Sequence, residues 1–184
     1  MKRELNDIIR IIKSLYKKGL YKEMNHECLD CLRNFSESDE ILFLTGASFL
    51  RLGDIRKASE YLEQAVSKAP EKLQYRIPLI NIYRENKNRV KCLINCLEAL
   101  KRAPGKPELL VETARCYLEA SETDKALHYI NKAAESGVPP DFIERFKSEV
   151  LYTADRFEDA LEHAKSAVRI SGETPMNLIC MSYS

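Results

Sequence analysis

The chain has 184 residues, of which 45% are hydrophobic, and its 29 basic and 28 acidic side chains leave a formal net charge of +1. This length and composition exclude a disordered or fibrous protein and fit one sizeable domain or one compact repeat array. The balanced charge excludes a general electrostatic attraction to nucleic acid or to an anionic membrane.

The amino-terminal residues, MKRELNDIIRIIKSLY, contain neither a long apolar core nor a small-residue cleavage site, so we expect no secretory signal. No stretch of the sequence approaches the roughly 20 apolar residues that a membrane helix needs. Six cysteines without a signal indicate free thiols in a reducing compartment. The expected location is therefore the cytoplasm, without membrane attachment.

The segment 38–70, SDEILFLTGASFLRLGDIRKASEYLEQAVSKAP, has apolar residues at helical spacing on both sides of Gly53 and Asp54. This pattern predicts a helix, a turn and a second helix. The first helix carries a large, a small and an aromatic residue, Leu42, Gly46 and Phe49. The second helix carries small residues around a large one, and a proline closes the segment: Ala58, Leu62, Ala65 and Pro70.

The same pattern recurs every 34 residues without insertion or deletion. One step forward places Tyr83, Ala99 and Pro104 at the aromatic, small and proline positions, and a second step places Ala114 and Tyr117. The match is weaker in the first and last stretches but keeps its phase. We therefore predict a single array of five repeats, 5–38, 39–72, 73–106, 107–140 and 141–174, followed by a partial capping helix at 175–184.

These repeats resemble the tetratricopeptide repeat (TPR), a 34-residue helical hairpin, whereas HEAT and armadillo repeats are longer. The resemblance implies an all-α fold, a right-handed α-solenoid of antiparallel helix pairs forming a TPR-like superhelix. The first helices of the repeats would then line a concave groove. Pro78 lies inside one predicted first helix, and we expect that helix to start late or to kink there.

The stretch HECLDC at residues 26–31 has the residue types of half a zinc site. However, Cys28 and Cys31 fall where helices pack in the repeat, and the pair Cys92 and Cys96 lies two repeats away, about 20 Å for stacked helices. Free cysteine often replaces alanine at such positions. We therefore expect these cysteines, and Cys116, to be buried and reduced, with no metal and no cofactor.

The sequence gives no catalytic signal. It has no glycine-rich phosphate loop, and His26, His128 and His163 fall on predicted outer helices without a nucleophile arrangement. Two local basic clusters, within residues 2–18 and 84–106, do not form a continuous basic stripe interleaved with aromatic residues. We expect neither an enzyme nor a nucleic-acid-binding protein.

In TPR proteins a partner segment commonly lies in the concave groove, and the resemblance implies which positions of each repeat contact it. The partner-binding residues expected on this basis are Phe43, Leu50, Arg51, Ile77, Asn81, Arg84, Val111, Arg115, Leu118, Phe142 and Tyr152. The same positions of the first two repeats also hold Lys13, Tyr16, Lys17 and Ala47. The apolar members would form a strip, and the arginines would pair with carboxylates. The alternative is that several apolar members tuck between neighbouring first helices.

Some TPR proteins bind the carboxylate tails of Hsp70 or Hsp90 through lysine, asparagine and arginine at fixed positions. In repeats two to four those positions hold Phe43, Ala47, Pro78, Glu108 and Glu112, and the other registers also lack the set. We therefore expect no binding of these chaperone tails by a carboxylate clamp.

The function expected from the sequence is a non-catalytic protein–protein interaction scaffold that binds a peptide or helix segment of a partner in its groove. Two alternatives stay open. One is a TPR targeting or regulatory module of a longer enzyme. The other is a self-associating assembly unit, because the ends of a solenoid leave apolar helix faces.

Overall fold

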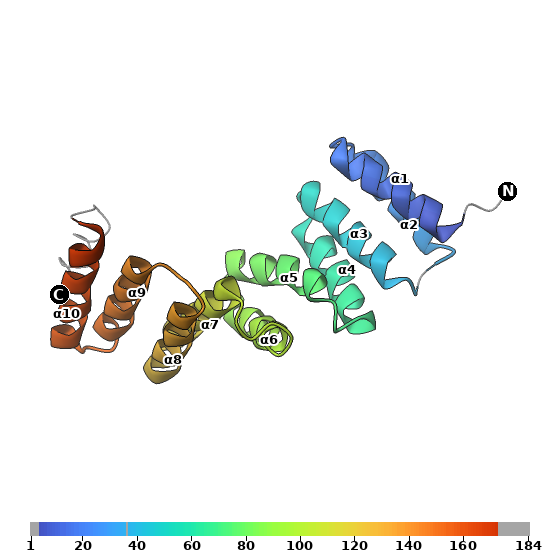
Figure 1. Ribbon diagram of the computed structural model, residues 1–184. Coiled ribbons are helices and arrows are strands. Elements are labelled where there is room, and N and C mark those ends of the chain that lie inside the picture. Colours follow the sequence, from blue (N-terminus) through green and yellow to red (C-terminus); the bar gives the residue numbers. More distant parts are fainter. Residues whose placement is uncertain (1–3, 36, 173–184) are drawn as a thin grey trace. The chain divides into compact units, whose positions relative to one another are not determined.

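The computed structural model describes residues 4–35 and 37–172, which form α-helices and no β-strand (Figure 1). The helices are α1 (Leu5–Lys17), α2 (Tyr21–Leu32), α3 (Asp39–Arg51), α4 (Ile55–Lys68), α5 (Leu73–Glu85), α6 (Arg89–Leu100), α7 (Pro107–Glu119), α8 (Thr123–Glu135), α9 (Pro140–Tyr152) and α10 (Phe157–Ser171). Among the described helices, none has the length and apolar character to cross a membrane. The expected capping helix at 175–184 lies outside the described residues.

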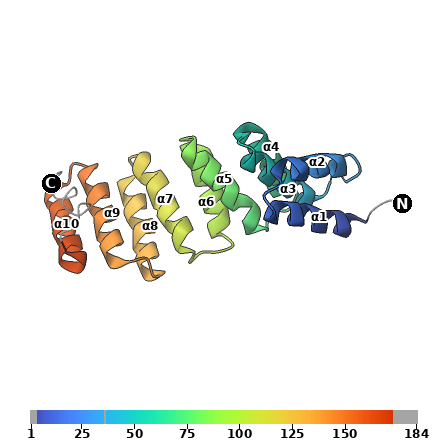
Figure 2. The ribbon, with the colours of Figure 1, turned by 90° about the horizontal axis from the view of Figure 1, so that it is seen from above.

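The chain divides into two compact bodies, residues 1–87 with α1 to α5 and residues 88–184 with α6 to α10. In the amino-terminal body α3 packs on α2 and α4, and α4 packs on α5. In the carboxyl-terminal body each helix from α6 to α10 packs on the next one in the chain, and Figure 2 shows α7 to α10 side by side. The boundary falls in the turn between α5 and α6. The sequence pattern does not reveal it, because the 34-residue phase continues across it.

The first helices of the predicted repeats begin at Leu5, Asp39, Leu73, Pro107 and Pro140. The last one starts one residue before the expected Asp141. Proline is favoured at the first helical position, because its missing N–H is not needed there and its fixed φ suits the helix.

The expected late start of the helix around Pro78 is wrong. Helix α5 begins at Leu73 and continues through Pro78 to Glu85. Proline removes one backbone hydrogen bond and crowds the preceding turn, at a cost of about 3 kcal/mol. Tyr75 and Leu79, on either side of Pro78, are buried. Burial of such side chains offsets the local cost, so tertiary packing decides the course of this helix.

The second helices supply a core of small and medium side chains at one repeat spacing. Each second helix buries three of them, almost without exposure: Met24, Cys28 and Cys31; Ala58, Leu62 and Ala65; Cys92, Cys96 and Ala99; Ala126, Ile130 and Ala133; Ala160, Ala164 and Ala167. Small side chains let two helices approach closely, and a larger one fills the space between crossings. The alternation read from the sequence therefore forms the buried face of each second helix.

The turns inside the hairpins repeat one backbone feature. A residue with positive φ follows each first helix, at Gly19 (74°), Gly53 (83°), Lys87 (54°), Ser121 (58°) and Asp155 (58°). These positions lie one repeat length apart. Glycine adopts this left-handed conformation without strain, whereas other L-residues lose roughly 1 kcal/mol or more.

Replacing Ser121 by glycine should therefore raise the free energy of unfolding of the carboxyl-terminal body by roughly 0.5–1 kcal/mol, because it relieves the strained turn. Thermal and urea unfolding followed by circular dichroism measure this change. The matched control is the reverse exchange, Gly53→Ser, where an added Cβ would have no atom within 4 Å and only backbone strain is introduced. Lower stability of Ser121→Gly, or unchanged stability of Gly53→Ser, would show that a non-glycine residue is not strained at this turn position.

Candidate functional site

A pocket of about 380 Å³ lies between α1 and α3 in the amino-terminal body. Its lining residues are Lys13, Tyr16 and Lys17 from α1, and Phe43, Leu44 and Ala47 from α3. All but Leu44 occupy repeat positions at which the TPR resemblance implies contact with a partner. The structure thus brings these predicted residues of two successive first helices together around one hollow.

The floor of the pocket is apolar, and packing against the core holds its residues in place. Leu44 is only 6% exposed and belongs to the core cluster formed by α1, α2 and α3. Phe43 packs against this cluster and against a second one that includes Leu42 and Tyr75. Its ring is stacked on Tyr75, with the centroids 4.6 Å apart and the planes 22° from parallel. Phe43 therefore both lines the pocket and packs between the first helices α3 and α5, as the alternative interpretation of the apolar positions allowed.

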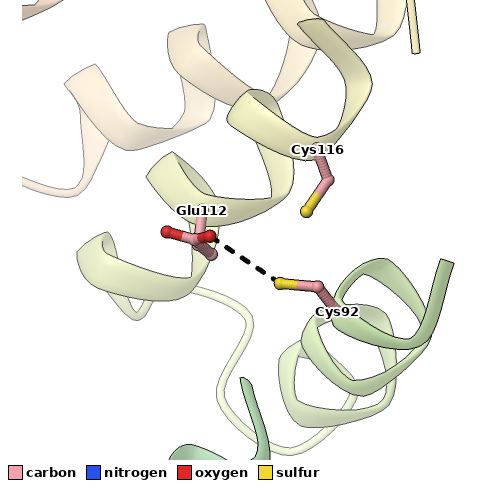
Figure 3. A group of neighbouring side chains, drawn as sticks. All are labelled: Cys92, Glu112 and Cys116. Carbon is pink, nitrogen blue, oxygen red and sulfur yellow. Dashed lines mark hydrogen bonds between the residues drawn. The ribbon is translucent and has the colours of Figure 1, made fainter. Parts of the chain in front are cut away.

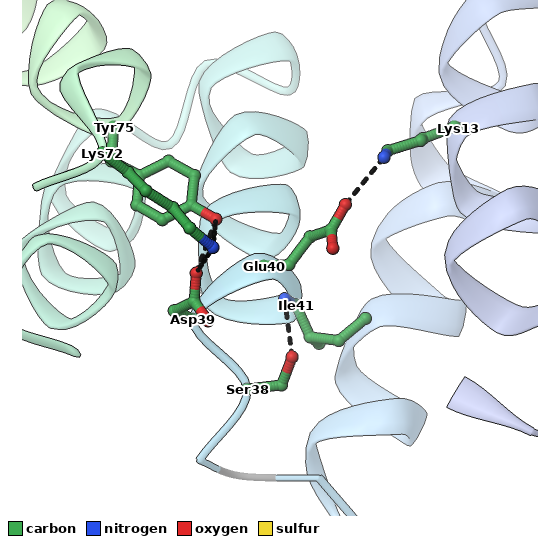
Figure 4. Close-up of polar contacts among 7 residues, drawn as sticks. All are labelled: Lys13, Ser38, Asp39, Glu40, Ile41, Lys72 and Tyr75. Carbon is green, nitrogen blue, oxygen red and sulfur yellow. Dashed lines mark hydrogen bonds and ion pairs between the residues drawn. The ribbon is translucent and has the colours of Figure 1, made fainter. Parts of the chain in front are cut away.

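Tyr75 is in turn held by a polar contact between α3 and α5 (Figure 4). Its hydroxyl donates to Asp39 Oδ2 at 2.7 Å, and Lys72 Nζ lies 2.5 Å from the same oxygen. Burial alone would raise the pKa of Asp39, but the hydrogen bonds from Lys72 and Tyr75 lower it below its ordinary value. Asp39 therefore stays ionised near neutral pH and fixes the ring that supports Phe43.

The rim of the pocket is polar and mainly basic. Lys13 Nζ pairs with Glu40 Oε1 at 2.7 Å (Figure 4). Lys17 is exposed, and within the part of the chain that the structure describes it makes no ion pair. Arg51 Nη2 donates to the hydroxyl of Tyr16 at 2.5 Å, and its guanidinium lies 5.3 Å from the centre of that ring. Tyr16 therefore positions Arg51, one of the arginines expected from the sequence to pair with a carboxylate of a partner.

The remaining predicted partner-binding residues lie on other first helices. In the amino-terminal body, Leu50 is partly exposed on α3, and α5 carries Ile77, Asn81 and Arg84. In the carboxyl-terminal body, α7 carries Val111, Arg115 and Leu118, and α9 carries Phe142 and Tyr152. The guanidinium of Arg115 lies 5.6 Å from the centre of the Phe146 ring of α9. This contact links two successive first helices, from the predicted groove residue Arg115 to the buried ring of Phe146.

A second hollow of about 310 Å³ lies among α8, α9 and α10. It is lined by Leu127, Asn131, Lys147, Leu151, Arg156, Asp159, Glu162 and His163, which include no serine, threonine or cysteine. His163 is half-buried, and its Nδ1 lies 2.7 Å from Glu144 Oε2. Because α9 and α10 pack on each other, the side chain of His163 on the outer helix α10 meets a carboxylate of α9.

The five cysteines in the described residues are buried and unpaired as disulfides. Cys28 and Cys31 belong to the core cluster of the amino-terminal body. Cys92 of α6 instead meets Cys116 of α7, in a group that also includes Glu112, and Cys96 lies one turn further along α6. Sequence reasoning compared the two cysteine pairs with each other and missed this neighbour. In stacked repeats the second helix of one repeat packs on the first helix of the next. This rule would have predicted that Cys92 lies near Cys116.

The helical hairpins, the recurring turn and the small-residue core define this chain as a helical-repeat protein with the TPR fold. It is similar to YrrB, described as a TPR protein with an unusual peptide-binding site, at 15% identity and a TM-score of 0.84, over 95% of this chain and 90% of that one. It is also similar to MamA from Desulfovibrio magneticus RS-1, at 15% identity and a TM-score of 0.74, over 90% and 93% of the two chains.

A third similar structure is TTC0263, a TPR protein of Thermus thermophilus, at 19% identity and a TM-score of 0.57, over 97% of both chains. At these identities the likeness concerns the fold. No family model matches the sequence, and no curated protein matches it.

Proposed function

We propose that this chain is a non-catalytic scaffold that binds a segment of another protein along its first helices, with the pocket between α1 and α3 as an anchoring point. The observation that carries the proposal is the combination of a fixed apolar floor with a basic rim. Phe43 and Leu44 form the floor, and Lys13 and Lys17 stand at the rim. The peptide-binding site named for YrrB supports the same kind of role. The proposed location is the cytoplasm.

The chemistry of the pocket indicates the kind of segment that it would accept. Binding sites of this size gain most of their affinity from one buried apolar anchor and their orientation from a few polar groups. Phe43 and Ala47 offer contact to an apolar side chain, and the ammonium group of Lys17 offers a partner to a carboxylate. We therefore expect the bound segment to carry an apolar residue next to an aspartate or glutamate.

Selection from a displayed random-peptide library, followed by fluorescence anisotropy with the selected peptide, tests the site. Phe43→Ala should weaken binding by on the order of 1–3 kcal/mol, as anchor residues do. Leu50→Ala should weaken binding less, because Leu50 does not line the pocket. The control is Val90→Ala, which removes an exposed apolar side chain of α6 (69% exposed). Equal binding by Phe43→Ala and Val90→Ala would move the site away from the pocket.

Charge reversal separates the rim from the floor. Lys17→Glu should reduce the association rate and the salt dependence of binding, because rim charges act mainly through long-range attraction. Lys22→Glu is the matched control, since Lys22 is an exposed lysine of the outer helix α2. If both reversals change the association rate equally, net charge alone is responsible and the rim has no special role. Arg115→Glu applies the same test to the carboxyl-terminal body.

A further inference from the structure

Two facing helices of the carboxyl-terminal body each present two side chains with metal-ligating atoms. Cys92 and Cys96 lie one turn apart on α6, and Glu112 and Cys116 lie one turn apart on α7. Residues at this spacing share one face of a helix. The contact between α6 and α7 therefore turns both pairs toward each other, and Figure 3 shows three of the four side chains converging.

The ligating atoms of this group are close together. The two Sγ atoms of Cys92 and Cys116 and a carboxylate oxygen of Glu112 all lie within 4.8 Å of one another. Cys92 Sγ is 3.7 Å from Glu112 Oε1. In a tetrahedral zinc site with Zn–S bonds of about 2.3 Å, neighbouring sulfurs are about 3.8 Å apart. Small rotations of side chains would bring the three atoms to that spacing.

Cys96 is the candidate for a fourth ligand beside these three. Its side chain is fully buried, and it lies one turn from Cys92 on the helix α6 that packs against α7. Residues at this spacing share one face of a helix, so Cys96 is the side chain that can complete the group of three.

Burial distinguishes this group from a surface cluster. Cys92 is 1% exposed, Cys116 5% and Glu112 8%, and Glu112 is the single charged residue among the buried side chains of the described part. Buried charges in proteins are normally hydrogen-bonded, paired or metal-coordinating.

We propose that Cys92, Cys96, Glu112 and Cys116 bind a zinc ion that joins α6 to α7. Zinc favours thiolate-rich tetrahedral sites, and binding would release the thiol protons of the coordinating cysteines to solvent. The ion would link the second helix of one repeat to the first helix of the next. This inference departs from the metal-free expectation, which compared only the cysteine pairs of distant repeats, and it is independent of the proposed peptide site.

The test uses the full chain with Cys180→Ser, which removes the cysteine outside the described residues, kept in a phosphine reductant and stripped of metal. Zinc is titrated in competition with a chromophoric chelator, and cadmium is titrated to count thiolates from the ultraviolet thiolate-to-cadmium absorption. We expect about one ion per chain with three thiolates. Cys116→Ala should weaken zinc binding at least about 100-fold, and the near-isosteric Glu112→Gln about tenfold.

The matched control is the double variant Cys28→Ala/Cys31→Ala, which removes two equally buried cysteines outside the group. It should bind zinc like the parent. Zinc should also raise the melting temperature of the parent and of this control but not of Cys116→Ala, because only a folded site gains from the ion.

Circular dichroism of the metal-free variants checks that they fold. If Cys116→Ala does not fold, Glu112→Gln still tests the zinc site. Weak binding by the parent, or equal loss of binding in the Cys28/Cys31 control, would overturn the proposal. So would unchanged zinc affinity in both Cys116→Ala and Glu112→Gln.

Discussion

Replacing Gly46 by valine should lower the free energy of unfolding of the amino-terminal body by about 3 kcal/mol. Gly46 lies where α3 crosses α4, and a Cβ atom there would be 2.7 Å from Leu62 Cγ and 3.1 Å from the carbonyl oxygen of Ala58. The first atom is the branch point of a buried side chain and the second belongs to the backbone, so neither can move away easily. Overpacking of this kind costs 1–3 kcal/mol or more, far above the small gain in helix propensity.

Urea unfolding followed by circular dichroism measures the loss, with attention to separate transitions of the two bodies. Gly105→Val is the control, because an added Cβ at Gly105 would have a single neighbour, Ser136 Oγ at 3.9 Å. Its stability should change by less than about 0.5 kcal/mol. A valine at position 46 that is tolerated as well as one at position 105 would show that the two helices are not in close contact.

Leu62→Ala should lower the stability of the same body by about 3 kcal/mol. Leu62 is fully buried between the small residues Ala58 and Ala65 of α4. Truncation of a buried leucine loses its transfer free energy and leaves a cavity, which together amount to 2–5 kcal/mol. Leu52→Ala is the control, since Leu52 is 40% exposed and should lose less than about 1 kcal/mol. A similar loss in both variants would contradict the assignment of Leu62 to the core.

The two sites should also be coupled. Gly46→Ala introduces the Cβ that meets Leu62, so its cost should shrink when Leu62 is already alanine. Residues in contact commonly show interaction energies of 0.5–3 kcal/mol in such a double-mutant cycle. Simple additivity of the two changes would indicate that the clash with Leu62 is not the cause of the Gly46 effect. The same stability measurements separate folding losses from the loss of peptide binding in Phe43→Ala.

Several features of the fold could be read from the sequence because they depend on local spacing. The small residues of the second helices repeat at one period, and so do the residues that open the first helices of the first four repeats. The turn glycines Gly19 and Gly53 have positive φ. Lys87, Ser121 and Asp155 have positive φ at the same position of the other three repeats. Hydrophobic periodicity and side-chain size are sufficient here, since the same spacing buries the same positions of each second helix.

The candidate site was only partly accessible from the sequence. Repeat phase selected Lys13, Tyr16, Lys17, Phe43 and Ala47, because equivalent positions of stacked hairpins share one face. It could not show that Phe43 is stacked on Tyr75, or that Tyr16 holds Arg51. These contacts depend on side-chain directions and on the distance between neighbouring helices, which residue spacing alone does not specify.

The sequence by itself determined the fold class, the repeat period and the small-residue crossings, since these follow from helical periodicity and side-chain volume. Only the tertiary structure decided which side chains of neighbouring repeats meet. In the tertiary structure α5 continues through Pro78, His163 pairs with Glu144, and the ligating atoms of Cys92, Glu112 and Cys116 lie close together. The physical reason is the same in each case: these outcomes depend on contacts between helices, whose free energies exceed the local preferences that a sequence pattern records.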